Sequence, residues 1–394
     1  MQELLPIFLR GQQFMRVLIV NRGMYTYGGA ELVIVKLANY MTKKGIKTAL
    51  LTTSIIPEMA KDLHETEVIV KKSALKLSPF NDLLSLHKGI HENLGKYDLI
   101  NVHNYPAELS TFPFHKPVVW MCNEPDLYLL LSLEVAPRIR AHMRYLINRS
   151  LFTVDRYVFK YYVRNAVVAD EFNRDRFVET YGFEPDIINY GIDYEFFSKG
   201  NRSRALEKFG LADSFIVLHV GMLTPFKNQI ESIRTVDRLK RNIPNIKLLL
   251  AGWGSGEWEM KLRQYVKERE LDQDVIFTGH LSREDLRDLY HACDVLIHPI
   301  KPQGGWLAPF EALCAGKTIV VSEEMTASHV IKTNKIGVVT NDFDKAIWDI
   351  YRDPSKYKEA AERGQKWVRE KLSWERFCEK MVNTFHKAIG ENRV

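Results

Sequence analysis

The stretch Ile216-Val-Leu-His-Val220, closed by Gly221, decides the fold class of this chain. It is a short run dominated by Val, Ile and Leu, without the apolar–polar alternation of a half-exposed strand. Such runs are typical of strands buried on both faces of a parallel sheet. Similar runs recur through the second half of the chain, at 247–251, 275–277, 295–297, 318–321 and 337–339.

The same alternation of short apolar runs and helical segments also fills the first half of the chain. Its runs lie at 17–20, 49–52, 99–102, 118–121, 166–169 and 187–188. The helical patterns include Glu31–Lys44, which Gly45 ends, and Glu284–His291 in the second half. Two successive β-α series predict an α/β protein with two doubly wound, Rossmann-like domains.

Glycines and charged residues interrupt the pattern between Asp193 and Leu211, and we place the domain boundary there. The predicted domains are residues 1–195 and 196–375. The last segment, 376–394, belongs to an amphipathic helical region (Glu359–Ala388) and is expected to cross back to the first domain. Ligands of open parallel sheets bind outside the carboxyl ends of the strands, so two sheets that face one another predict a site in a cleft between them.

Composition narrows the class of protein. The 394 residues are 46% hydrophobic and 26% charged, the profile of a folded globular chain. The four cysteines are scattered without a C-x-x-C pair, which argues against a disulfide framework or a zinc site and fits a reducing, cytoplasmic compartment. No apolar run reaches the roughly 18 residues of a membrane span, and no secretory signal opens the chain. The net charge of +6 is spread over both halves, so we expect no nucleic-acid partner.

The first candidate site motif is Gly28-Gly29-Ala30-Glu31, which follows the first apolar run and opens the first long helix. Glycine lets a ligand approach the backbone, and the N–H groups at a helix start favour an anion such as a phosphate. The plain alternative is an ordinary strand-to-helix turn.

The second motif is the loop Gly221–Asn228, in which Lys227 follows the end of a strand. A lysine there can reach a diphosphate as a point charge. The alternative is a solvated lysine.

The third and most informative motif is Gln303-Gly304-Gly305-Trp306-Leu307, which continues to Glu311. Two glycines precede a predicted helix, so backbone N–H groups face the site. Glu311 lies within that helix, where its carboxylate can accept hydrogen bonds from ribose hydroxyls. A capping or salt-bridging glutamate is the alternative.

Together these motifs resemble family 4 of the retaining glycosyltransferases, which have the GT-B fold. Further matching stretches are Asn189–Phe197, Leu248–Gly254, Val275–Gly279 and the block from Glu311 to Lys317. The patterns occur in the family's order and cover nearly the whole chain.

The resemblance implies a retaining, metal-independent transferase without a cofactor. It would move a hexosyl group from a nucleotide-diphosphate donor to a hydroxyl of a glycan, lipid-linked or small-molecule acceptor. The diphosphate would meet Lys227 and the N–H groups of Gly304–Leu307, Glu311 would hold the ribose, and Phe277–Leu281 would lie beside the base. The implied donor-binding set is Gly28, Gly29, Gly221, Lys227, Phe277, Thr278, His280, Gln303, Gly304, Gly305, Trp306, Leu307 and Glu311.

Three positions depart from the family pattern. Met222 stands where the family usually has Arg, so Lys227, the helix-end N–H groups or Lys301 must supply the charge. Gln303 replaces the first Glu of the family's E-x7-E motif, which contacts the transferred sugar. Asn123 stands where a His is common. We therefore assign Lys227, Gln303 and Asn123 to catalysis.

The acceptor side is assigned to His103, Asn123 and Glu124, although His103 can equally be a structural histidine bonded to backbone. The basic, aromatic stretch Arg138–Arg164 predicts either peripheral docking on anionic lipid at the inner face of a membrane or a helix pair with one solvated face. Two other functions stay open. A GT-B-like nucleotide-sugar epimerase would consume a donor without an acceptor, and a degenerate, non-catalytic scaffold would bind no nucleotide diphosphate.

Overall fold

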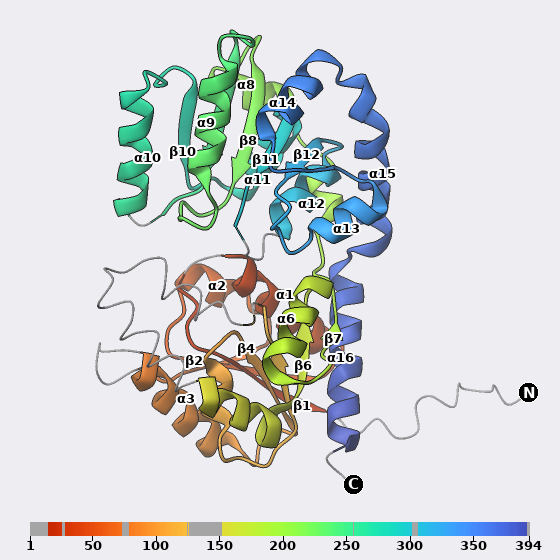
Figure 1. The fold of residues 1–394 in the computed structure, drawn as a ribbon. Coiled ribbons are helices and arrows are strands. Elements are labelled where there is room, and N and C mark those ends of the chain that lie inside the picture. The colour runs from red at the N-terminus through yellow and green to blue at the C-terminus, as the bar shows by residue number, and fades with distance from the viewer. Residues whose placement is uncertain are drawn as a thin grey trace, which may run out of the picture. The chain divides into compact units, whose positions relative to one another are not determined.

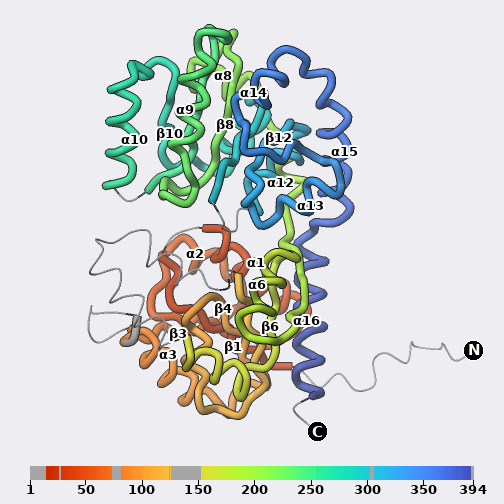
Figure 2. The backbone as a smooth tube through the Cα atoms, viewed as in Figure 1, coloured from red at the N-terminus to blue at the C-terminus, as the bar shows by residue number. Residues whose placement is uncertain are grey.

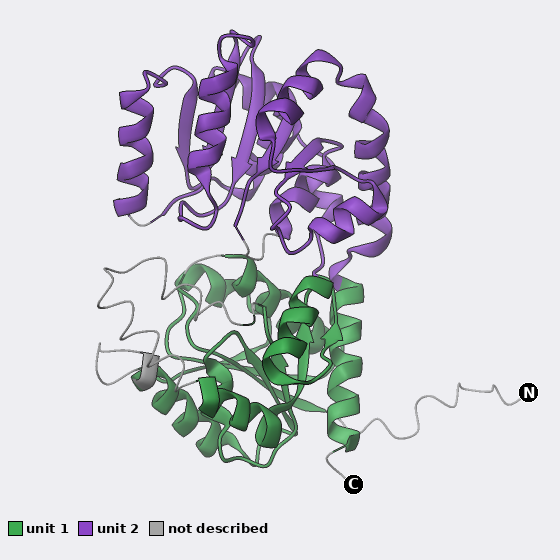
Figure 3. Cartoon of the chain, viewed as in Figure 1, with its two compact units in different colours: residues 1–189, 375–394 green, residues 190–374 purple. Residues whose placement is uncertain are grey.

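The computed structural model describes residues 15–25, 28–72, 79–123, 125, 152–254, 256–301 and 306–391. The chain divides into two compact units, shown in Figure 3: unit 1 is residues 1–189 with 375–394, and unit 2 is residues 190–374. The boundaries predicted from the sequence lie at 195/196 and 375/376.

Unit 1 is built on a parallel sheet of seven strands in the order β3-β2-β1-β4-β5-β6-β7. The first strand pairs with β2 on one side and β4 on the other, so the direction of winding reverses between β1 and β4. The strands are β1 (Arg16–Asn21), β2 (Lys47–Thr52), β3 (Glu67–Val70), β4 (Leu99–His103), β5 (Val118–Met121), β6 (Arg164–Val168) and β7 (Asp186–Ile187).

Helices cover the faces of this sheet (Figure 1). The central strands are buried along almost their whole length, as the apolar runs predict, and Trp120 of β5 is the largest fully buried side chain. The helices of unit 1 are α1 (Gly29–Lys43), α2 (Pro57–Asp62), α3 (Pro79–Asn93), α6 (Glu171–Tyr181) and α16 (Trp374–Glu391), with a 3-10 turn η2 (Ala107–Thr111) and a π-helical turn η3 (Phe159–Val163).

Unit 2 repeats the design with six parallel strands in the order β10-β9-β8-β11-β12-β13, so the winding reverses between β8 and β11. Its strands are β8 (Phe215–Val220), β9 (Ile246–Ala251), β10 (Val275–Gly279), β11 (Val295–His298), β12 (Thr318–Val321) and β13 (Val338–Val339). Its helices are α7 (Tyr194–Phe197), α8 (Arg202–Phe209), α9 (Gln229–Leu239), α10 (Gly256–Glu268), α11 (Arg283–Ala292), α12 (Leu307–Cys314), α13 (Ser328–Asn334), α14 (Phe343–Arg352) and α15 (Ser355–Lys371). The two doubly wound sheets confirm the predicted α/β class.

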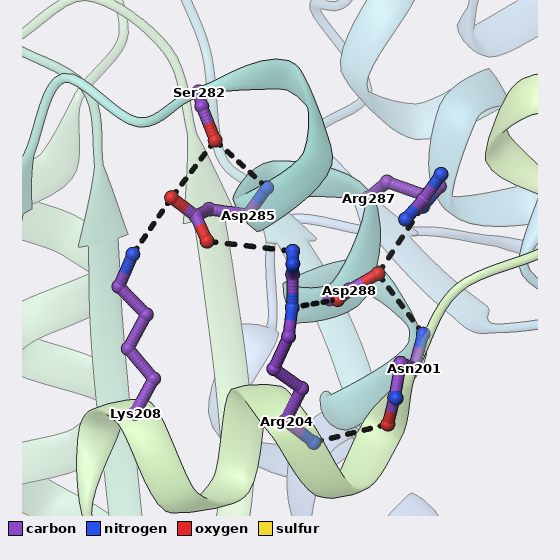
Figure 4. A network of polar contacts seen from close by, with 7 residues as sticks. All are labelled: Asn201, Arg204, Lys208, Ser282, Asp285, Arg287 and Asp288. Atoms are coloured by element: carbon purple, nitrogen blue, oxygen red, sulfur yellow. Dashed lines mark hydrogen bonds and ion pairs between the residues drawn. The ribbon is translucent and has the colours of Figure 1, made fainter.

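An ion-pair network joins α8 to α11 (Figure 4). Asp288 is 1% exposed, and it accepts hydrogen bonds from Asn201 N at 2.9 Å and Arg287 Nε at 3.1 Å and pairs with Arg204 Nε at 2.6 Å. Burial by itself would raise the pKa of Asp288, but these donors outweigh burial and lower the pKa below the usual value of 3.8. The network therefore holds α8 against α11 through a buried, ionised carboxylate.

The C-terminal region, expected to be helical and amphipathic over Glu359–Ala388, forms the two helices α15 and α16. The break between α15 and α16 falls at Leu372, whose carbonyl accepts a hydrogen bond from Ile192 N at 2.9 Å. Beyond the break, α16 packs on unit 1, where Thr384 Oγ1 donates to Asp186 Oδ2 at 2.9 Å. Figure 2 shows this last helix beside elements from the first half of the chain.

Candidate functional site

The candidate site of unit 2 lies at the carboxyl ends of β8 and β11, where the winding of the sheet reverses. Loops after two such strands run in opposite directions and leave room for a ligand between them. Here the loops are also joined: Lys301 N donates to Phe226 O at 3.0 Å, and Asn228 Nδ2 donates to Pro299 O at 2.8 Å. The second predicted motif and the strand before the third therefore come together.

Close backbone packing holds the loop after β8. Gly221 has a φ of +155° and Gly252, after β9, a φ of +151°, and a Cβ on Gly252 would lie 2.1 Å from Gly221 O. Only glycine fits at position 252, because any side chain would push the two strand ends apart. A Cβ on Gly221 would lie 3.6 Å from the side-chain methylenes of Lys227, so the lysine stem folds back across the end of β8.

Two buried histidines lie close to Lys227, and neither was singled out in the sequence. His219 is the penultimate residue of β8 and His298 the last residue of β11; their rings lie 5.8 Å apart and each residue is 1% exposed. His219 Nδ1 bonds Ser232 Oγ at 2.8 Å, whereas no nitrogen of His298 has a partner among the described residues. Burial lowers the pKa of His219 to about 3 and also lowers that of His298, and the positive charge of Lys227 adds to both effects. Both rings are therefore neutral and add no positive charge beside Lys227.

The described part of the third motif begins at Trp306 and leads into α12. Trp306 is 3% exposed and stacks on Phe310 at a ring distance of 4.9 Å, which anchors the start of the helix. The first N–H groups of a helix have no partner within the helix and attract anions. Gln303, Gly304 and Gly305 lie outside the described residues, so of the predicted N–H group only Trp306 and Leu307 are placed.

Glu311 is the fifth residue of α12 and half-buried. Burial raises its pKa to about 7, although the Tyr290 hydroxyl, which donates to Oε2 at 2.7 Å, and the positive charge of Arg283 act in the opposite direction. Arg283 Nη2 in turn pairs with Asp193 Oδ2 at 2.6 Å. This carboxylate is thus a hydrogen-bond acceptor held in place by a buried phenol, which the sequence motif did not include.

The segment predicted to lie beside a base covers the end of the edge strand β10 and the residues that follow it. Phe277 is half-buried under the guanidinium of Arg263, 4.2 Å from the ring centre, and His280 is exposed. Thr278 Oγ1 donates to Gly279 O at 3.1 Å. Since β9 separates β10 from β8, a ligand that touches Phe277 and Lys227 must span about two strand spacings, roughly 10 Å.

The candidate residues of unit 1 gather at the corresponding reversal between β1 and β4. Asn123 donates through Nδ2 to Asn104 Oδ1, Asn104 Nδ2 donates to Asn21 Oδ1 at 3.3 Å, and Asn21 Nδ2 donates to Gly23 O at 3.0 Å. This chain of amides crosses the carboxyl ends of β5, β4 and β1. The motif at α1 also lies at this edge: Gly28 is the N-cap of α1 and Gly29 its first residue.

His103 is the last residue of β4 and fully buried, and its Nε2 bonds Asn101 Oδ1 at 2.8 Å. Burial lowers its pKa to about 3, so the ring is neutral. Glu124 lies outside the described residues. The acceptor-side roles of these two residues and of Asn123 stay predictions.

The described residues carry neither a cluster suited to a metal ion nor a helix suited to a membrane span. No group of three or more His, Cys, Asp or Glu side chains in them could hold a metal ion. None of their helices combines the length and the apolar character needed to cross a bilayer.

Two family models match the chain, one on each half. "Glycosyltransferase Family 4" matches residues 27–196, and "Glycosyl transferases group 1" matches residues 201–367. The chain belongs to the group 1/family 4 glycosyltransferases. This confirms the resemblance inferred from the motifs.

Similar curated proteins are enzymes of this family that are named for different donors and acceptors. One is a GDP-mannose-dependent alpha-(1-6)-phosphatidylinositol monomannoside mannosyltransferase of Mycolicibacterium smegmatis, 24% identical over 219 residues, or 52% of this chain and 57% of the relative. Another is a lipopolysaccharide 1,2-N-acetylglucosaminetransferase of Salmonella typhimurium, 24% identical over 222 residues, or 51% of this chain and 57% of the relative. The matched region spans little more than half of the length of each.

Among solved structures, Anabaena HepE in complex with UDP and glucose has a TM-score of 0.77 at 18% identity, covering 94% of this chain and 99% of that one. The similarity shows that this family 4 glycosyltransferase has the GT-B fold.

The departure at Met222 changes the surface of the site. Met222 is 42% exposed at the carboxyl end of β8, and Trp253, 42% exposed, follows β9. Leu223 N donates to Trp253 O at 2.9 Å, so the two segments run side by side. The sequence identified the missing arginine at 222, but not the exposed indole that accompanies it.

Proposed function

We propose that this glycosyltransferase moves a hexosyl group from a nucleotide-diphosphate donor to a hydroxyl of a glycan, lipid-linked or small-molecule acceptor, with retention of the anomeric configuration. The observation that supports the proposal is that the loop carrying Lys227 is hydrogen-bonded, at the strand reversal of unit 2, to the segment after β11 that precedes α12 and Glu311 in the chain. A cation and helix N–H groups suit a diphosphate, and a carboxylate on the same helix suits a ribose diol.

In the proposed reaction the acceptor oxygen forms a bond to the anomeric carbon while the bond from that carbon to the phosphate oxygen breaks. Negative charge develops on the departing nucleotide diphosphate, and the acceptor proton passes to its phosphate oxygen. Retention requires the new bond to form on the face that the phosphate leaves. Lys227 and the N–H groups at Leu307 would stabilise the departing charge. Preorganised donors of this kind often accelerate a reaction by about 10²-fold or more.

The neutral state of His219 and His298 supports this role for Lys227. A protonated imidazole in either position would repel the lysine ammonium and add a second cation at the strand ends. Because both rings stay uncharged, neither histidine opposes the positive charge of Lys227. Gln303 and Asn123 remain proposed contacts to the transferred sugar and to the acceptor.

The proposal is tested by two substitutions with a matched control. Lys227→Met keeps the aliphatic stem and removes the charge, and Glu311→Ala removes the ribose acceptor. Lys332, exposed in the last turn of α13, provides the control Lys332→Met. We expect transfer from labelled UDP-, GDP- or ADP-sugars to fall at least about 100-fold in both site variants and to stay unchanged in the control.

Transfer close to normal in both site variants would contradict the proposal. Donor consumption without an acceptor would indicate an epimerase, and calorimetry without binding of any nucleotide diphosphate would indicate a non-catalytic scaffold. Metal independence is tested in the same assay, because transfer should persist in excess EDTA.

A further inference from the structure

A second candidate binding site lies in unit 1, at the opposite end of the sheet from Asn123. A cavity of about 160 Å³ opens where the chain enters β5 and β6. Its walls come from the segment before β5, from η3 and the start of β6, and from the end of α16: His115, Lys116, Pro117, Val118, Tyr161, Tyr162, Val163, Arg164, Asn165, Ala388 and Glu391. None of these residues belongs to the site described above.

The charged lining favours an anion. Lys116 and Arg164 contribute two positive charges against the single carboxylate of Glu391 at the end of α16. Lys116 Nζ donates one hydrogen bond, to Tyr97 O at 3.2 Å, which leaves the ammonium two further N–H donors. The exposed Arg164 side chain has no hydrogen bond or ion pair within the described part of the chain, so its donors are available to a ligand. A guanidinium can hold two oxygens of one phosphate at once.

The backbone at Arg164 is an independent sign of function. Arg164 has a φ of +64°, a left-handed conformation that Gly or Asn adopts far more readily, and it caps the π-helical turn η3. Both features recur at functional sites more often than elsewhere. Here a long cationic residue lines the cavity at a position where a smaller residue would satisfy the turn.

An exposed aromatic face, formed by Phe112, Tyr157, Tyr161 and Tyr162, adjoins the cavity. Tyr157 lies 4.8 Å from Tyr161 and Phe112 lies 4.9 Å from Tyr162, measured between ring centres. Phe112, Tyr157 and Tyr161 are 42%, 51% and 45% exposed. Aromatic rings beside a cationic cavity can cover the uncharged body of a ligand while the cavity takes its anion.

We propose that this cavity binds a phosphate group carried on a larger body, with Arg164 and Lys116 on the phosphate oxygens and the aromatic face against the remainder. The phosphate could come from a soluble phosphomonoester or from the headgroup of an anionic lipid in a bilayer. The proposal does not depend on the transfer reaction, because no residue of the cavity lies at the carboxyl edge of either sheet.

The experiment measures binding of the full-length protein to four probes. Calorimetry with glycerol 3-phosphate and with inorganic phosphate tests soluble sources, and co-sedimentation with phosphatidylglycerol vesicles, against phosphatidylcholine vesicles, tests the lipid source. If the protein binds glycerol 3-phosphate and shows no preference for phosphatidylglycerol vesicles, the ligand is a soluble phosphomonoester. If it prefers phosphatidylglycerol vesicles and does not bind glycerol 3-phosphate, the ligand is a lipid headgroup. Either result supports the proposal. Failure of all four probes to bind overturns it.

The variants assign the binding to the cavity. Arg164→Asn removes the charge and tolerates the left-handed backbone, and Lys116→Gln removes the other cation. Lys47, exposed at the start of β2 on the same edge of the sheet, gives the control Lys47→Gln. We expect each cavity variant to weaken binding at least tenfold, the control to bind as the wild type, and Arg164→Asn to unfold at no lower denaturant concentration. Equal loss in the control, or no loss in the cavity variants, overturns the proposal.

Discussion

The hydroxyl of Tyr290, on α11, donates a hydrogen bond to Oε2 of Glu311, on α12, at 2.7 Å. Burial raises the pKa of Glu311 to about 7, and the Tyr290 hydrogen bond is the largest of the influences that restrain this rise. The charge of Glu311, the proposed ribose acceptor, therefore changes near neutral pH, and the Tyr290 hydrogen bond favours its ionised form.

The first prediction is a pH-dependent donor affinity. The ionised Glu311 accepts hydrogen bonds from a ribose diol better than the protonated form, so nucleotide affinity should fall as the pH drops through about 7. Tyr290→Phe removes a bond that favours the carboxylate and should move this midpoint to higher pH. Glu311→Gln should abolish the titration. Calorimetric affinities between pH 5.5 and 8.5 check this, and an identical midpoint in wild type and Tyr290→Phe would refute the link.

The second prediction concerns the missing arginine. Met222 is 42% exposed, so Met222→Arg can place a guanidinium at the end of β8 without repacking the core. Beside Lys227 it should tighten binding of a nucleotide diphosphate about 5- to 20-fold, with a steeper decline in high salt. Met260, 64% exposed on α10, gives the control Met260→Arg, which adds the same charge elsewhere. Equal tightening in both variants would mean that the total charge of the protein, and not the site, is responsible.

The third prediction concerns acid stability. His298 is buried and its pKa lies below the ordinary value of 6.5. Just below pH 6.5 this histidine is therefore protonated in the unfolded chain and neutral in the folded chain. The stability tied to this group is complete above pH 6.5 and is lost as the pH falls below it. When the pH falls from 7.5 to 5, the free energy of unfolding of His298→Leu should therefore decrease by about 1–2 kcal/mol less than that of the wild type. Urea unfolding measures the difference, and the exposed His329→Leu should behave as the wild type.

The fourth prediction concerns the network of Figure 4. Asp288→Asn removes a buried charge that three donors compensate, and the free energy of unfolding at pH 7 should drop by about 1–3 kcal/mol. The pKa of Asp288 lies below 3.8, so its contribution is present above pH 3.8 and fades as the pH falls further. The gap between wild type and variant should close toward pH 2.5. Glu284→Gln, an exposed change on the same helix, should leave stability unaffected, and a gap that is independent of pH would contradict the assignment.

The strand ends show how far the sequence could predict the site. Lys227, Trp306 and Glu311 were identified from glycine-bearing loops that follow buried runs and from the family resemblance, and the loops after parallel strands meet at one edge of the sheet. Three residues of the site, His219, His298 and Tyr290, were not predicted from the sequence. They lie inside strands and a helix, where a polar or aromatic residue among apolar ones is normally interpreted as part of the core. Only the pairing of β8 with β11, and the packing of α11 against α12, places them beside the site.

The amide chain from Asn123 to Asn21 escaped prediction for the same reason, since its members follow three strands that are far apart in the chain. The break between α15 and α16 at Leu372, whose carbonyl accepts a hydrogen bond from Ile192 N, lies close to the predicted start of the last helix at 376.

By itself, the sequence determined the α/β class, two sheets of buried parallel strands and the family, because apolar periodicity and glycine-bearing loops are local properties of the chain. Tertiary structure alone decided which polar groups meet at each reversal, that burial raises the pKa of Glu311 to about 7, and that Arg164 lines a cavity. Those outcomes depend on burial and on distances between residues remote in sequence, which no local pattern encodes.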